Sequence, residues 1–286
     1  MRFILSLTLA CGIASLSVAI AQVPQSSAEF RASSDAQKQA ALVALGQRTS
    51  NPPLDALKEI VTTGLADPIV RTRRNALNVI TARSVSMRST PIDARRAMTD
   101  EKAMLADLMP AALNALEDGD KFVRLDAILA IGNLDLALSQ TSDGQMQISP
   151  RVGTALARAY DVEKDPGVRS ELVKSFALIS GPAAVPTQAI GDALIGKALD
   201  DPNDYAQATA IKGVGVRRIT ALLPQLAAFL KAPSSEVRMQ VAQTFARFGK
   251  DAAPYINTLR AAADVETNDI VKKTMLGSIN VIAAAK

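Results

Sequence analysis

A short pattern that returns along the chain constrains its fold more than any other feature. Each copy has an acidic turn, then a Val-Arg or Val-Lys pair, then apolar residues at helical spacing. The clearest copies start at Val123, Val168, Val237 and Val271. Self-similarity at a period of some 30 to 50 residues is typical of a solenoid, in which each unit buries its apolar face only by stacking on its neighbours.

The basic residues of the copies define one alignment column. Two degenerate copies join it, one with Arg73 and one in which Gln replaces the basic residue, so the column reads Arg73, Arg124, Arg169, Gln207, Arg238 and Lys272. The successive spacings are 51, 45, 38, 31 and 34 residues. The long early intervals indicate insertions, which we place at 84–99 and 139–150, and Arg71 is an alternative register for the first copy.

Composition favours helices over sheets. Apolar residues make up 48% of the chain but aromatic residues only 3%, and the abundant Ala and Leu are strong helix formers. We therefore predict an all-α fold, an α-solenoid in which antiparallel helix pairs stack into a superhelix of about six repeats over residues 36–286.

The N-terminus predicts export. Arg2, an apolar run and the small residues around Ala21 match a secretory signal peptide at 1–21 that is cleaved after Ala21. A lipoprotein modified at Cys11 and an uncleaved N-terminal anchor are the alternatives. Residues 22–35 are polar and Ser-rich, and we interpret them as a flexible leader. The expected location is the periplasm or the exterior of the cell.

Cleavage would leave a mature chain with no Cys, because Cys11 is the only one, and the sequence has no His. These absences exclude a disulfide, a thiolate nucleophile, an imidazole base and a zinc site of the usual Cys/His kind. We predict no cofactor and no metal. The net charge of +4 is too near neutral to favour nucleic acid, and no later segment is apolar enough to span a bilayer, so membrane contact would be peripheral at most.

The pattern itself, clearest in 118–132 and 237–249, resembles the HEAT repeat, including the short HEAT-like repeats of the phycobilin-lyase-like subfamily. The resemblance covers residues 54–284. It implies helix pairs in a right-handed superhelix with protein binding on the concave face. The sequence departs from the family at Gln207 and in the two insertions.

In this family the basic column looks like a ladder that ties successive repeats together, each basic group bonding a carboxylate or a helix-end carbonyl. The ladder residues by this reading are Asp118, Arg124, Arg169, Arg238 and Lys272. A charged binding stripe is the alternative.

Arginines also gather between residues 71 and 102, with little acidic compensation. A positive surface there could meet an acidic protein or an anionic lipid surface, and a merely solvated face is the alternative. The candidate partner-binding residues are Arg74, Arg88, Arg95 and Arg96. We expect Arg88, Arg95 and Arg96 to be accessible and dispensable for folding because they lie outside the repeated column.

These features favour an exported, non-enzymatic scaffold of the cell envelope that binds a protein partner, an acidic one if the arginine cluster carries the site. The alternative is an enzyme or accessory subunit related to the HEAT-like lyases. A DNA-binding repair protein is disfavoured by export and by the absence of Trp. The sequence does not indicate an oligomeric state.

Overall fold

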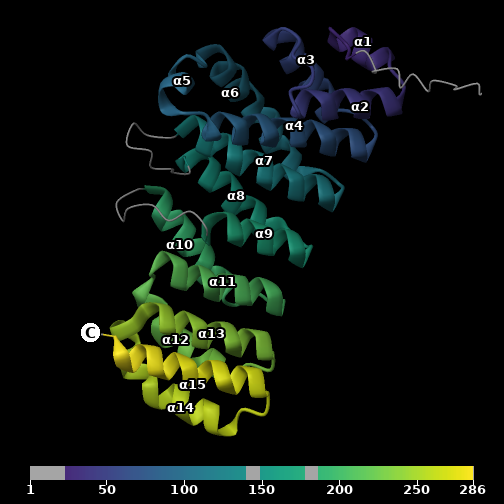
Figure 1. Ribbon diagram of the computed structural model, residues 1–286. Coiled ribbons are helices and arrows are strands. Elements are labelled where there is room, and N and C mark those ends of the chain that lie inside the picture. Colours follow the sequence, from purple (N-terminus) through teal and green to yellow (C-terminus); the bar gives the residue numbers. More distant parts are fainter. Residues whose placement is uncertain (1–22, 140–148, 178–185, 286) are drawn as a thin grey trace, which may run out of the picture.

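The protein forms a stack of helix pairs, as the computed structural model shows (Figure 1). The structure describes residues 23–139, 149–177 and 186–285, and within these ranges there are helices and no strand. The predicted α-solenoid is therefore confirmed. Each pair consists of an outer helix followed by an inner helix that carries the repeated column.

The outer helices are α1 (Ser27–Ala32), α3 (Leu54–Leu65), α6 (Thr99–Asn114), α8 (Pro150–Val162), α10 (Pro186–Ala198), α12 (Leu223–Ala228) and α14 (Ile256–Val265). The inner helices are α2 (Asp35–Gly46), α4 (Val70–Ser89), α7 (Lys121–Ser139), α9 (Pro166–Ala177), α11 (Asp204–Arg217), α13 (Ser235–Phe248) and α15 (Asp269–Ala284). One further short helix, α5 (Ile92–Arg96), lies between α4 and α6.

The core runs along the stack because the column fixes which side of each inner helix is apolar. The residues four positions after the column are at most 1% exposed in five successive inner helices: Leu77, Ile128, Val173, Ile211 and Ala242. Each inner helix packs on the inner helix of the next repeat, and α4 lies against α7 as α11 lies against α13. Burial of a side chain such as Ile128 contributes about 1.5–3 kcal/mol.

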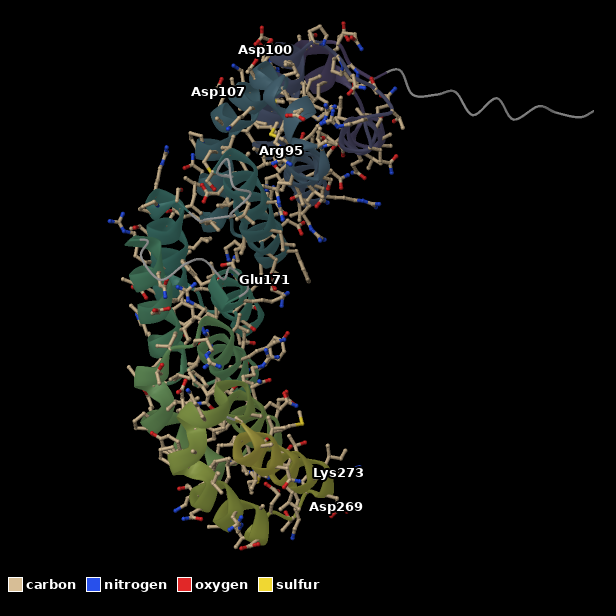
Figure 2. All side chains as sticks on the ribbon, turned by 60° about the vertical axis from the view of Figure 1, so that its left-hand side comes forward. Arg95, Asp100, Asp107, Glu171, Asp269 and Lys273 are labelled. Atoms are coloured by element: carbon tan, nitrogen blue, oxygen red, sulfur yellow. The ribbon has the colours of Figure 1, made fainter. Side chains whose placement is uncertain are left out.

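The stack bends into an arc. Figure 2 shows Glu171 of α9 and Lys273 of α15 on the inner, concave side of this arc. The inner helices therefore line the concave side.

Residues 23–35 are not part of a flexible leader, which the sequence predicts for 22–35. Helix α1 begins after Ser26, whose side chain accepts a hydrogen bond from the Glu29 N–H. Phe30 is fully buried, and Ser27 Oγ donates to Glu59 of α3 at 2.9 Å. The single aromatic side chain anchors α1 on α3, so α1 and α2 form one more helix pair ahead of the predicted repeats.

The first predicted insertion, 84–99, is largely helical. Helix α4 continues to Ser89 before Pro91 interrupts the chain, and α5 follows at once. Met87 is fully buried, which holds this last turn of α4 on the core.

Some sequence predictions lie outside the described residues. The signal peptide at 1–21 does so entirely, and so do positions 140–148 of the second insertion. Among the residues that the structure does describe, no helix has the length and apolarity needed to cross a bilayer.

Candidate partner-binding surface

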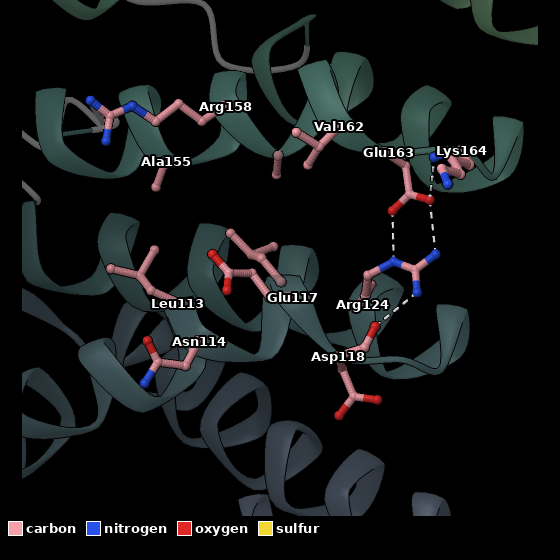
Figure 3. Close-up of a pocket in the computed structure, with 12 residues that line it drawn as sticks. Leu113, Asn114, Glu117, Asp118, Arg124, Ala155, Arg158, Val162, Glu163 and Lys164 are labelled. Carbon is pink, nitrogen blue, oxygen red and sulfur yellow. Dashed lines mark hydrogen bonds and ion pairs between the residues drawn. The ribbon is translucent and has the colours of Figure 1, made fainter.

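The basic column forms a line of ion pairs between successive repeats. Arg124 Nε and Nη2 donate to the two carboxylate oxygens of Glu163 at 2.6 and 2.8 Å, and Arg124 Nη1 donates to the carbonyls of Asp118 and Gly119 (Figure 3). The same double contact recurs in the pairs Arg73–Asp118, Arg169–Asp201 and Arg238–Glu266. Two parallel charge-assisted hydrogen bonds fix both the distance and the orientation of neighbouring repeats.

Each acid of this ladder also organises its own turn. Asp118 Oδ1 accepts the Asp120 N–H at 2.8 Å, and Glu266 Oε1 accepts the Asn268 N–H at 2.9 Å. The acid therefore shapes the turn before the inner helix while it receives the arginine of the preceding repeat.

The arginine contacts lower the pKa values of the ladder acids. The hydrogen bond from Arg238 is the largest cause for Glu266, whose pKa falls from 4.5 to about 2. Burial raises the pKa of Asp118, but the hydrogen bonds from Arg73 and the Asp120 N–H outweigh it and leave that pKa below its usual value.

The ladder begins earlier than the sequence suggested. Lys38 Nζ of α2 lies 2.9 Å from Asp67 Oδ2, in the place that arginine occupies further along. A simple signal could have found it, because each acid stands six residues before the basic residue of its own repeat, as Asp67 stands before Arg73. Lys272, in contrast, makes no ion pair within the described part of the chain.

One junction of the ladder lacks both members of its ion pair. Gln207 replaces the arginine and donates instead to the carbonyl of Leu199 at 2.7 Å. The position that should supply its acid in the next repeat, six residues before Arg238, is Ala232. The junction between α11 and α13 therefore lacks the ion pair. At the C-terminal end of α11, Arg218 contacts Asp251 at 3.0 Å.

The predicted arginine cluster is mostly engaged within the fold. Arg95, which we expected to be accessible, is half-buried and donates from Nη2 to the carbonyls of Arg88 and Thr90 at 2.8 and 2.6 Å. Arg88 is half-buried too and donates to Asn133 Oδ1 of α7 at 2.8 Å. Both predictions of accessibility are wrong, because Arg95 caps carbonyls at the end of α4 and Arg88 binds a side chain of the neighbouring inner helix.

The other two candidates differ. Arg74 Nε binds Asp126 of α7 at 2.7 Å, and its guanidinium lies over the Phe122 ring. Its side chain stays 41% exposed, so it remains at the surface although its charge is paired. The side chain of Arg96 lies outside the described parts of the structure.

Two rows of exposed residues follow the concave side. The first row lies two residues before the column and contains Ala36, Arg71, Phe122, Gly167, Tyr205, Glu236 and Ile270. The second row lies five residues after the column and contains Val43, Asn78, Leu129, Lys174, Lys212, Gln243 and Gly277. The two rows are seven residues, or about two helical turns, apart, so they lie on one face of each inner helix. This face points between the directions in which Lys273 and Glu171 point from their own helices.

The outer helices leave two equivalent grooves at the ladder edge. One, between α6 and α8, has a volume of about 630 Å³ and includes Val162 (Figure 3). The other, between α12 and α14, has a volume of about 740 Å³ and includes Val265. The two valines precede the ladder acids Glu163 and Glu266 and are 75% and 78% exposed. Each groove thus presents one apolar side chain beside an ion pair that is already satisfied.

Comparison with known proteins supports the same architecture. A family described as HEAT repeats matches residues 192–280. The crystal structure of an archaeal HEAT-like repeats protein from Thermococcus onnurineus NA1 has a TM-score of 0.54 and 14% identity, and covers 92% of this chain and 98% of that chain. A structure of computationally designed armadillo repeat proteins for modular peptide recognition has a TM-score of 0.46 and 17% identity, with 91% and 99% covered. No curated protein sequence matches the chain.

Proposed function

We propose that this chain, a solenoid of HEAT-like repeats, is an exported and non-enzymatic scaffold that binds a partner protein along its concave side. The two exposed rows carry this proposal. They present one or two side chains from every inner helix, and the fold uses most of them for nothing else. A continuous strip of this kind suits an extended partner better than a compact ligand.

The apolar members of the rows are the strongest part of the argument. Phe122, Tyr205 and Ile270 of the first row are 47%, 63% and 71% exposed. A single exposed apolar residue needs no explanation. Three at one structural position, on three helices of the same side, form a repeated contact point, and large aromatic and aliphatic residues dominate the energy of protein interfaces.

Export belongs to the proposal as well. The apolar run before Ala21 supports transfer across the inner membrane and cleavage. Fractionation of the native host should recover the protein from the envelope fraction, and N-terminal sequencing of that material should begin at Gln22. A cytoplasmic protein that retains Met1 would contradict export.

The scaffold function can be tested by site-specific photocrosslinking in the native host. A photoreactive phenylalanine analogue placed at Phe122, Tyr205 or Ile270 should form the same discrete adduct. The analogue at Ala106 or Arg260, which are exposed on the outer helices α6 and α14, should form none. Adducts from the outer positions alone, or from no position, would contradict a concave binding surface.

The alternative, an enzyme related to HEAT-like lyases, gains no specific support. The described residues contain no group of three or more acidic side chains that could hold a metal ion. In each ladder ion pair, the arginine and the carboxylate already bind each other.

A further inference from the structure

A small cavity opens in the middle of the concave side. Helices α9, α11 and α13 enclose about 190 Å³ between Lys174, Lys212 and Gln240, with Tyr205 at the edge. Sites for drug-sized ligands usually measure about 300–1,000 Å³. This cavity is smaller, and it suits a short stretch of peptide rather than a cofactor.

Lys212, Glu236 and Gln240 line the cavity, and their side chains have no partner within the described part of the chain. Lys212 and Glu236 are exposed and make no ion pair, although they stand on the neighbouring helices α11 and α13. The Gln240 side chain is only 8% exposed and makes no hydrogen bond. Its amide atoms are not sealed from solvent, so a ligand that enters the cavity can reach them.

The second lysine of the cavity, Lys174, is already engaged. Lys174 Nζ binds Glu171 one turn earlier on α9, at 3.0 Å. The charges that remain free are therefore one ammonium, from Lys212, and one carboxylate, from Glu236. The nearly buried amide of Gln240 lies in the same cavity.

We propose that this cavity binds an extended peptide segment that carries an acidic and a basic residue two positions apart. The acidic side chain pairs with Lys212 and the basic one with Glu236. Gln240 both donates to and accepts from one peptide unit between them, because a primary amide offers both functions. This inference rests on the proposed scaffold function and names the chemistry of its partner.

The dimensions agree with this pairing. Residues two apart in an extended chain point to the same side and lie about 6.6–6.8 Å from each other. Packed helices lie about 8–10 Å apart, and flexible Lys and Glu side chains cover the remaining difference. The Tyr205 ring, 63% exposed, can cover the aliphatic stem of the basic residue or its cation.

Methyl NMR of the full mature protein tests the proposal. The probe is a blocked heptapeptide, Gly-Ser-Glu-Ser-Lys-Ser-Gly, and its neutral counterpart has Gln at both charged positions. The charged peptide should shift the methyl signals of Ala208 and Val216, which line the cavity, and leave that of Val162 in place. Lys212→Gln, Glu236→Gln and Gln240→Leu should each weaken binding about threefold to fivefold.

Matched controls are available on the same side of the molecule. Lys273→Gln and Asn280→Leu alter exposed residues of α15 outside the cavity and outside both rows and should leave the affinity unchanged. Equal binding of the neutral peptide, equal effects of the controls, or shifts confined to Val162 would overturn the proposal. If photocrosslinks form at Phe122 and Ile270 but the peptide leaves Ala208 unshifted, this inference fails and the scaffold stands. If those crosslinks are absent, the scaffold itself fails.

Discussion

At the scale of single residues, the ladder acids make stability depend on pH. The pKa of Glu266 falls from 4.5 to about 2 in the folded chain, so the unfolded state binds a proton more readily. The stabilisation is complete above about pH 4.5 and is lost as the pH falls through about 2.

We therefore expect the wild-type protein to lose more stability between pH 6 and pH 3 than Glu266→Gln does. Urea unfolding midpoints at the two pH values measure this difference. Glu236→Gln, which removes an exposed carboxylate outside the ladder, is the control and should follow the wild type. An identical acid response of Glu266→Gln and wild type would contradict the role assigned to the Arg238 contact.

A second residue-scale prediction separates two arginines that look alike in the sequence. Arg95→Ser removes two hydrogen bonds to carbonyls at the end of α4 and should cost about 1–3 kcal/mol of unfolding free energy. Arg71→Ser changes an exposed side chain of the first row and should change stability by less than about 0.5 kcal/mol. Equal unfolding midpoints in urea would contradict the capping role of Arg95.

At the scale of elements, mutation can introduce the ion pair that is missing between α11 and α13. Gln207→Arg with Ala232→Glu should restore the double contact seen at the other junctions and stabilise the protein by about 1 kcal/mol. Either change alone should give no gain, since each adds one unpaired charge.

A double-mutant cycle in urea measures the coupling. A double variant that is no more stable than the sum of its single variants would show that the junction no longer has room for the pair.

The elements also show what the sequence could and could not reveal. The inner helices were predictable because Ile128 and its equivalents recur at fixed distances from the column. Helix α1 was not, because Phe30 is one apolar residue in a polar segment and its burial depends on α3, about 30 residues away. Arg88 and Arg95 were misjudged for a similar reason. Arg95 caps the end of α4 from the helix that follows it, and Arg88 binds Asn133, a partner 45 residues away that no local pattern indicates.

The candidate site, too, could be predicted only in part from the sequence. Arg124 and its equivalents fall in one column, and the acids six residues earlier could have been aligned with them. The cavity at Gln240 could not be foreseen, because three helices that are distant in sequence enclose it.

At the scale of the whole molecule, the stack should be elongated in solution. A globular chain of this length would have a radius of gyration of roughly 19 Å. Small-angle X-ray scattering should give a clearly larger value, together with a helical circular dichroism spectrum. A value near 19 Å or a large strand signal would contradict the solenoid.

The ladder has a consequence for how such a chain can change over time. At five of the six junctions between described repeats, one repeat contributes a cation and the repeat that follows contributes the carboxylate. A duplicated or deleted repeat would therefore meet its new neighbours with the correct partners already in place. The remaining junction has Gln207 and Ala232 at the two positions, so neither of its repeats is left with an unpaired charge.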